Sequence, residues 1–391
     1  MEHNYMLDEI LSYPTLMDAV YEPLYRQAES VIPDEVLQQV DTVYIYGSGD
    51  SLNAANCVCQ SFWDFARIPA YPIPALQASR YIAHSLTPGL AQKTLTICIS
   101  NSGSAARSVE AAGALRRAGC RTAAITANPA SGVGSHTEYI LEAKAPAFPQ
   151  APLPVPGIRS FALPVIGLNL LAIRMGLVRG ALTEPQAQAL RQELQELSVV
   201  LHTAFQQNGD TLRAFAARCA ASERMEFLAA GPCRGAADFG VSKVLEAQGY
   251  SVLSQDLEEF AHQTFFSLDT HSLPTVLIAP SRSRSLSRAR EILSVLQHLE
   301  RPILVLTDDP AAIPAAPGVQ TVCLCRPVRE TLAPLVFSAL MTYLSSVMPL
   351  RDGDVYMHGH SGVYCEEGLP TVRGSKIEID EAGGSVNGTE I

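Results

Sequence analysis

The sequence predicts an α/β protein in which parallel sheets are flanked by helices. Short apolar segments alternate with helical segments along most of the 391 residues, a pattern typical of βαβ units. A layout of strand, glycine turn and helix, followed by strand, serine turn and helix, occurs twice, which indicates an old tandem duplication. Hydrophobic residues make up 47% of the chain and charged residues 17%, which excludes a disordered or fibrous protein.

The first half begins with a helical, partly polar stretch and continues into the first strand. An apolar run at residues 42–46 leads directly into Gly47-Ser48-Gly49, and residues 51–65 can form a helix. We expect further strands at residues 94–99, 121–125 and 139–143, and a further helix at 105–118.

The second half follows a proline-rich segment, residues 145–157, which cannot form a regular element, and a long helical stretch. We expect strands at residues 227–230, 251–254, 275–279, 303–307 and 321–325, and helices at 236–248, 288–299 and 330–347. The chain therefore divides into an N-terminal helical segment (1–40), a first subdomain (41–182), connecting helices (183–223), a second subdomain (224–350) and a C-terminal tail (351–391).

Composition excludes some functions and favours one compartment. The chain has 28 basic and 39 acidic residues and a formal net charge of −11, which argues against binding nucleic acid or an anionic membrane. Nine cysteines, an odd number without a CxxC pair, indicate reduced thiols and a cytoplasmic protein. We expect no signal peptide, and we expect a buried helix at the apolar residues 160–178, because Pro164, Asn169 and Arg174 interrupt them.

Two loops that follow strands are candidate sites for a phosphate. Residues 47–51 end a strand and open a helix, where backbone N–H groups and the helix dipole attract anions. Residues 100–104 repeat this placement and add three serine hydroxyls, so both loops could meet at the carboxyl ends of parallel strands. A structural turn and ordinary helix capping are the alternatives. The candidate binding residues are Gly47, Ser48, Gly49, Asp50, Ser51, Ser100, Asn101, Ser102, Gly103 and Ser104.

A third group of residues could transfer protons. Glu246 lies late in a predicted helix, and Glu259 and His262 follow a short predicted strand. A carboxylate can move a proton between adjacent sugar carbons, and a histidine can open a sugar ring because imidazole titrates near neutrality. A solvated helix residue and a satisfied polar contact are the alternatives for Glu246 and His262.

Several segments resemble tandem SIS (sugar isomerase) proteins. They are GSGDSLNAA, ISNSGSAARSVEAA, RRAGCRTAAITAN and LEAQGYSVLSQDLEEFAH, and the resemblance covers about residues 35–350. It is strongest to the isomerase half of glucosamine-6-phosphate synthase and to the related sugar-phosphate deaminases and fructosamine-phosphate deglycases. The spacing from Glu246 to His262 and the Glu259-x-x-His262 pair also fit this pattern. The resemblance implies two flavodoxin-like subdomains and a homodimer with its site at the subunit interface.

The same resemblance assigns roles to binding residues. Ser100 and Ser102 would bind the phosphate, and Gly49 and Ser51 would lie nearby. Glu259 would lie among the binding residues.

It also assigns catalytic roles. Glu246 would carry the proton between C1 and C2, and His262, supplied by the partner subunit, would assist ring opening. Lys376 in the tail is the counterpart of a tail lysine in the synthase relatives. The chain has only four lysines, so Lys376 and Lys243, which stands beside Glu246, are the amines to test.

The sequence departs from the synthase pattern at several positions. Ala105 stands where a threonine is usual, and Asp50 stands where a small hydroxyl residue is usual. His262 is followed by Gln263-Thr264 instead of Gly-Pro, and no glutaminase domain precedes residue 40, so we do not expect nitrogen transfer from glutamine. Asp50 would repel a phosphate, so it slightly favours a substrate that presents an ammonium group.

These features predict a cytoplasmic enzyme without a metal or cofactor that acts on a phosphorylated amino sugar or fructosyl-amine, as an isomerase, deaminase or deglycase. A non-catalytic sugar-phosphate sensor is the alternative from another class, and a structural dimer with a dead site is the third. The spacing of His358, His360 and Cys365 is a weak metal-binding pattern. The turn at residues 281–285 lacks glycine and is expected to be a copy of the phosphate loop that no longer binds.

Overall fold

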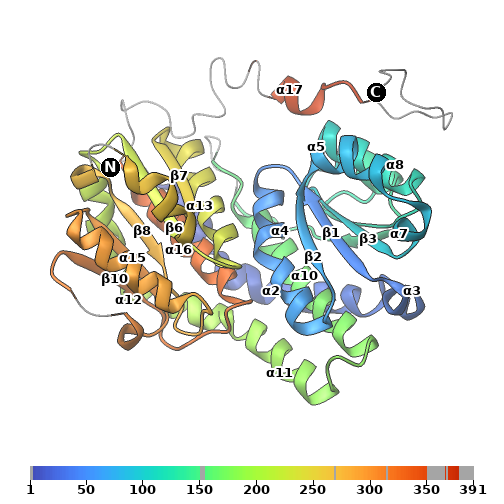
Figure 1. The fold of residues 1–391 in the computed structure, drawn as a ribbon, viewed down its shortest axis with the longest axis horizontal. Coiled ribbons are helices and arrows are strands. Elements are labelled where there is room, and N and C mark those ends of the chain that lie inside the picture. Colours follow the sequence, from blue (N-terminus) through green and yellow to red (C-terminus); the bar gives the residue numbers. More distant parts are fainter. Residues whose placement is uncertain are drawn as a thin grey trace.

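The computed structural model describes residues 3–149, 155–267, 270–313, 316–349, 366 and 369–377. Two parallel five-stranded sheets lie in separate halves of the molecule, and helices flank each sheet (Figure 1). The predicted α/β fold, with two sheets of parallel strands, is confirmed.

The first sheet has the strand order β2-β1-β3-β4-β5, with all neighbours parallel. Its strands are β1 (Thr42–Gly47), β2 (Ala70–Pro74), β3 (Thr94–Ile99), β4 (Arg121–Thr126) and β5 (Tyr139–Glu142). The order reverses between β1 and β3, so the loops after these two strands lie side by side at the carboxyl edge of the sheet. Strand β2 was not predicted, because Pro72 and Pro74 argue against a strand; they are tolerated because β2 is an edge strand that pairs only with β1.

The second sheet has the strand order β10-β9-β8-β6-β7, again with all neighbours parallel. Its strands are β6 (Arg224–Ala229), β7 (Ser251–Asp256), β8 (Thr275–Ile278), β9 (Ile303–Thr307) and β10 (Val319–Cys323). When the strands of each sheet are numbered from the first strand of that sheet, both sheets have the order 2-1-3-4-5. The topology therefore agrees with the predicted duplication.

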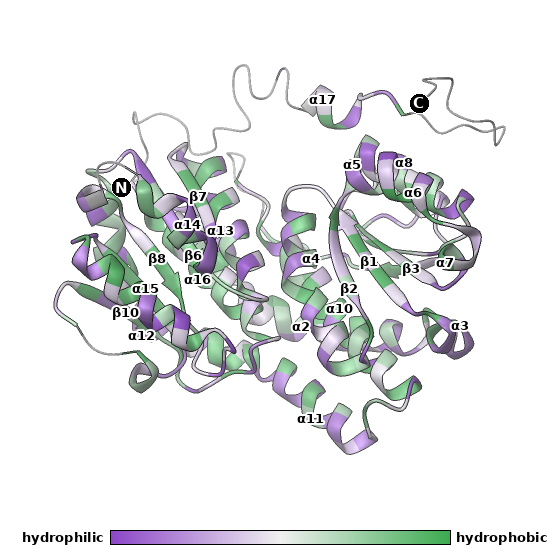
Figure 2. Ribbon diagram, viewed as in Figure 1, coloured by the Kyte–Doolittle hydropathy of each residue, from purple (hydrophilic) through white to green (hydrophobic). Residues whose placement is uncertain are grey.

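Long helices fill the space between the two sheets (Figure 1). They are α4 (Asp50–Ser61), α10 (Arg159–Val178), α13 (Cys233–Gln248) and α16 (Ala333–Val347). Helix α13 packs against both α16 and α4, and α10 packs against α4 and α2 (Tyr13–Ser30). Both α10 and α16 are apolar on nearly all faces because they are surrounded by protein (Figure 2).

Other helices cover the outer faces and connect the halves. They are α1 (Tyr5–Leu11), α3 (Asp34–Gln39), α8 (Ala106–Arg117), α11 (Glu184–Gln195), α12 (Leu197–Cys219), α14 (Leu257–His262), α15 (Leu286–His298) and α17 (Leu369–Arg373). Among the described residues, α10 is the one helix that is long and apolar enough to cross a membrane. Most of it is buried inside the protein, as predicted for residues 160–178.

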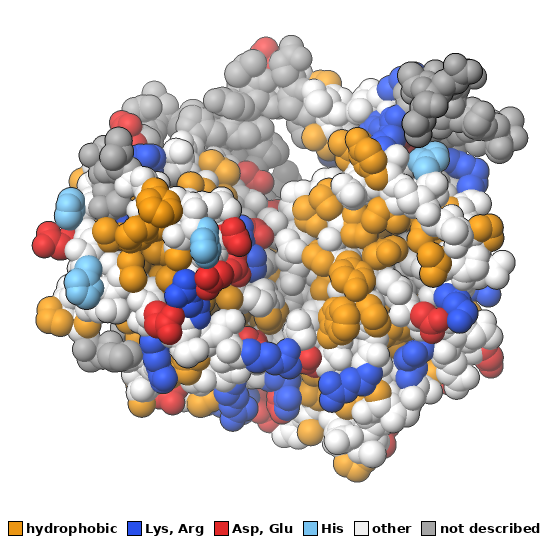
Figure 3. Space-filling model, in the orientation of Figure 1, with side chains coloured by type: hydrophobic (Ala, Val, Ile, Leu, Met, Phe, Trp, Pro, Cys, Tyr) orange, Lys and Arg blue, Asp and Glu red, His pale blue; other side chains and the backbone are white. Residues whose placement is uncertain are grey.

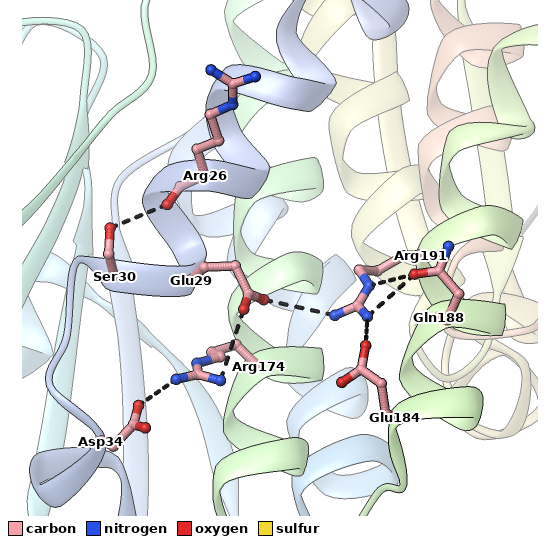
Figure 4. Close-up of polar contacts among 8 residues, drawn as sticks. All are labelled: Arg26, Glu29, Ser30, Asp34, Arg174, Glu184, Gln188 and Arg191. Carbon is pink, nitrogen blue, oxygen red and sulfur yellow. Dashed lines mark hydrogen bonds and ion pairs between the residues drawn. The ribbon is translucent and has the colours of Figure 1, made fainter.

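A network of ion pairs fixes the N-terminal helices to α10 and α11 (Figure 4). Arg174 on α10 lies 2.6 Å from Asp34 and 3.7 Å from Glu29. Glu29 also lies 3.7 Å from Arg191 on α11, which pairs with Glu184 as well. One carboxylate on α2 is thus shared by two arginines from different helices.

Candidate functional site

The first loop depends on two glycines. Gly49 has φ +55°, a conformation that side-chain-bearing residues rarely adopt. A Cβ on Gly47 would lie 2.5 Å from the Cβ of Ser51 and 3.0 Å from the carbonyl oxygen of Ile99. Gly47 therefore permits the close approach of this loop to β3. Within the described part of the chain no side chain caps the first turn of α4, so the helix N-terminus opens toward the neighbouring loop.

The second loop exposes two of its three serines, whereas Ser100 is buried. Asn101, Ser102 and Ser104 are exposed, and the Ser104 hydroxyl donates to Ser102 Oγ over 2.9 Å. Gly103 has φ +66°, and a Cβ there would overlap Ser131 Oγ. Ala105 precedes α8 and has no group with which to cap it. Both the backbone turn and the uncapped helix start suit an external anion.

The two loops meet at one pocket of about 140 Å³. Asp50 and Ser51 from the first loop line it together with Asn101 from the second, and α10 closes it on another side. The remaining lining residues are Ile99, Ile125, Thr126, Ala143, Ser160, Phe161 and Pro164. The predicted convergence of the loops is present; their role in binding stays a prediction.

Lys243 joins this pocket to the second half of the chain. Its side chain is fully buried, and its ammonium group donates to Asp50 Oδ2 at 2.8 Å, to Glu246 Oε2 at 2.6 Å and to the Gly157 carbonyl at 3.1 Å. The ammonium also lies 4.9 Å from the ring centre of Phe239. All three of its N–H donors are therefore used within the protein.

The charge state of Lys243 follows from these partners. Burial alone would lower the pKa of Lys243, but the carboxylates of Asp50 and Glu246 outweigh it and leave that pKa raised. The group is therefore an ammonium at neutral pH. From the sequence, Lys243 was noted as a neighbour of Glu246 and as an amine to test, without a role of its own. The available signal was the spacing of three residues, which places both side chains on one helix face.

The position of Asp50 corrects one expectation. The sequence suggested that this carboxylate slightly favours an ammonium group on the substrate, yet its Oδ2 binds the ammonium group of Lys243 instead. Its other oxygen, Oδ1, is buried and has no hydrogen-bond partner among the described residues. Asp50 lines the pocket, so this oxygen can accept a hydrogen bond from a ligand.

His262 and Glu259 lie outside this arrangement. His262 Nε2 is 3.2 Å from Glu258 Oε1, and its side chain is 67% exposed. Glu259 is exposed and accepts a hydrogen bond from Gln263 over 2.8 Å. Neither residue lines the pocket, and Glu246 reaches it only through Lys243, which binds the pocket residue Asp50.

The described part of the tail lies against the first subdomain. Helix α17 contacts α8, and Ser375 Oγ accepts a hydrogen bond of 3.2 Å from Arg107, the second residue of α8. Arg107 is also paired with the buried Glu110. Lys376 is exposed and follows Ser375, so it lies on the side of the second loop.

No metal site is seen among the residues that the structure describes. His358, His360 and Cys365 lie outside them, so the weak metal-binding pattern is not tested.

The loop after β8 holds the position in the second sheet that the loop after β3 holds in the first. Its Ser283 hydroxyl and Arg284 N–H donate to Glu330 Oε1 over 2.8 Å and 3.1 Å. Asp308 accepts a 2.5 Å bond from the N–H of Ser281. The groups that would bind an anion here are thus bonded to the protein's own carboxylates.

Comparison with known proteins agrees with this fold. Residues 36–174 match the SIS domain family. Over 366 residues the chain is 24% identical to the glutamine–fructose-6-phosphate aminotransferase (isomerizing) of Zymomonas mobilis, covering 90% of this chain and 57% of that protein. The chain thus spans little more than half the length of this relative.

Solved structures share the architecture of nearly the whole chain. The C-terminal domain of the glucosamine-fructose-6-phosphate aminotransferase from Francisella tularensis has a TM-score of 0.78 at 17% identity, covering 89% of this chain and 95% of its own. The glucosamine-6-phosphate deaminase from Thermotoga maritima has a TM-score of 0.64 at 17% identity, covering 87% and 92%. Residues 36–174 are therefore an SIS domain, and the chain is similar over most of its length to the isomerase part of glutamine–fructose-6-phosphate aminotransferases.

Proposed function

We propose that the protein is a sugar-phosphate enzyme that moves a proton between C1 and C2 of a phosphorylated amino sugar or fructosyl-amine, as a deaminase, a deglycase or an aldose–ketose isomerase. The relatives are named as aminotransferases that isomerise and as a deaminase, which supports this class. The observation that carries the proposal is the position of Glu246, which is held by a buried ammonium group that also binds Asp50, a residue that lines the pocket of the two loops.

The phosphate would bind at the loops rather than at a basic side chain. The N-termini of α4 and α8 supply N–H groups and the positive ends of two helix dipoles. The exposed hydroxyls of Ser102 and Ser104 supply further donors. A chain of net charge −11 can bind an anion in this way, because the fixed dipoles act locally.

Glu246 would take the proton from one sugar carbon and return it to the next. Its Oε2 is bound to Lys243, so the carboxylate has a fixed direction. Lys243 has no donor left for the substrate, so its role would be to orient Glu246. The developing negative charge on the sugar would need another cation or dipole, and Lys376 in the tail and Arg107 on α8 are the candidates.

We propose that a second copy of the chain supplies His262. Exposed apolar residues lie on the elements that contact α14, the helix of this histidine: Leu253 is 45% exposed, Phe265 37% and Phe266 71%. Other exposed apolar residues lie on the first half, at Trp63, Tyr71, Leu76 and Tyr81. Figure 3 shows apolar side chains gathered over both halves of this face. Such patches favour association with another protein surface.

The first experiment is a substrate panel of phosphorylated ketoses, amino sugars and fructosyl-amino acids, with release of hexose phosphate and amine monitored. Glu246→Gln should keep substrate affinity and lose about 10²- to 10⁴-fold in kcat. Glu22→Gln, on the exposed face of α2, is the control and should match wild type. Tight binding of one compound without turnover of any would establish the sensor instead of the enzyme.

Complementation tests the shared site. Dimers mixed from Glu246→Gln and His262→Ala chains would contain one intact site if His262 acts across the interface. Mixing two inactive variants should then restore up to about a quarter of wild-type activity, because half of the dimers are mixed and each has one intact site. No recovery in dimers shown by light scattering to have exchanged would contradict a site made from two chains.

A further inference from the structure

Asp50 belongs to the first half of the chain, whereas Glu246 belongs to the second. We propose that Asp50 is a positioning residue for Glu246 and acts through Lys243. The inference rests on the proposed function, in which Glu246 is the base. It gives a role to Asp50, which stands where the synthase pattern has a small hydroxyl residue.

The geometry of the ammonium group carries the argument. Lys243 donates to Asp50 at 2.8 Å, to Glu246 at 2.6 Å and to the Gly157 carbonyl at 3.1 Å. Three fixed acceptors leave a tetrahedral ammonium one orientation. Loss of the Asp50 carboxylate would remove the charge from one of these three acceptors, so the ammonium group would be held less firmly in its place beside Glu246.

The helices that carry these residues are in direct contact. A Cβ on Gly235 of α13 would lie 2.6 Å from the carbonyl oxygen of Asn53 on α4, so the two backbones touch. Asn53 also donates to Ser242 over 3.1 Å, one residue before Lys243. The Asp50–Lys243 distance is therefore held by backbone packing, and the first loop and the base are positioned as one unit.

Two carboxylates share one ammonium group, so each weakens the hold of the other. Without Asp50, the charge of Lys243 would act on Glu246 alone and favour its ionised form, which makes it a weaker base.

Among the described residues, the two helices packed closely against α13 bring no charged group other than Asp50 to Glu246. Helix α13 packs against α16, which has no charged residue, and against α4, where Asp50 is the one charged residue. On the adjoining strands, Asp256 caps α14, Glu226 is in a buried ion pair, and Arg224 is exposed.

Asp50→Asn tests the proposal, with the best substrate of the panel. We expect kcat to fall about 10- to 100-fold with KM within about threefold of wild type. We also expect the acid limb of the kcat/KM profile to move to lower pH. Asp64→Asn is the matched control, because Asp64 also joins the two halves, at 2.6 Å from Arg284, but lies outside the pocket. It should leave kcat and the profile unchanged.

Asp50→Glu keeps the carboxylate and should return the acid limb to its wild-type position. A second readout needs no turnover: in ¹³C spectra of the carboxyl groups, assigned with Glu246→Gln, the Glu246 signal should titrate at lower pH in Asp50→Asn.

Unchanged titration of Glu246 in a folded Asp50→Asn protein would overturn the proposal. So would a fall in kcat that Asp64→Asn shares and that leaves the acid limb in place, because that result describes a purely structural contact. Absence of any turnover by wild type would count against the proposed function, and the carboxyl titration would still decide the role of Asp50.

Discussion

The loops after β3 and β8 hold the same position in two sheets of identical strand order, yet their polar groups are satisfied differently. After β3, Ser102 and Ser104 are exposed in a loop whose Asn101 lines a pocket. After β8, Ser283 and Arg284 are bonded to Glu330, whose side chain is 11% exposed. A carboxylate of the protein thus stands where an anionic ligand would bind. A duplicated site can lose its ligand and keep its turn when an internal acceptor takes over.

The largest expected effect concerns the glycine that the loop after β8 lacks. Gly103→Ala would place an alanine at φ +66°, at a cost of about 1–2 kcal/mol, and its Cβ would overlap Ser131. We expect a total loss of about 3 kcal/mol or more in the free energy of unfolding, with loss of sugar-phosphate binding. Chemical denaturation and calorimetry measure both quantities.

Gly318→Ala separates the cost of the positive φ from the cost of the overlap with Ser131. Gly318 has φ +78°, and the space around it is open. It should lose only about 1–2 kcal/mol and bind normally. Equal losses in the two variants would show that the contact with Ser131 does not matter.

The second prediction removes the internal acceptor. Glu330→Ala leaves the Arg284 N–H and the Ser283 hydroxyl without their partner, so we expect a loss of about 1–3 kcal/mol with kcat unchanged. Inorganic phosphate should raise the melting temperature of this variant more than that of wild type. Glu291→Ala, in an exposed pair with Arg288, is the control and should be nearly neutral. If phosphate stabilised the variant and wild type equally, the loop after β8 would not be a former anion site.

The smallest expected effect concerns the network of ion pairs between the N-terminal helices and α10 and α11 (Figure 4). Glu29→Gln should cost about 1 kcal/mol or less, because Arg174 keeps Asp34 and Arg191 keeps Glu184. The difference in melting temperature between variant and wild type should be smaller at high salt than at low salt, since salt screens such pairs. A loss that salt does not reduce would indicate packing rather than charge.

The fold was predictable because its signals are local. Apolar runs and the turns after them identified the strands that are buried in each sheet, such as β3 and β8. Strand β2 was missed because Pro72 and Pro74 suppress the local signal, and only its place at the edge of the sheet explains it. Helix α13 begins at Cys233 rather than at residue 236, because the turn after β6 is shorter than its glycines suggested.

The candidate site was predictable only in parts. Local sequence placed Asp50 in a glycine loop and Glu246 on a helix. The ammonium group between them depends on the packing of α4 against α13, and no spacing in the sequence reports that contact. The loop after β8 was expected to be a degenerate copy, but Glu330, which bonds its polar groups, lies 47 residues from Ser283.

Lys243 also offers a chemical probe of the molecule. The other lysines of the chain, Lys93, Lys144 and Lys376, are exposed, whereas Lys243 is buried between α4 and α13. An amine-directed reagent should therefore modify three positions quickly and the fourth only when the halves separate. The labelling rate of this one lysine, read by mass spectrometry, would time the opening of the contact between the halves.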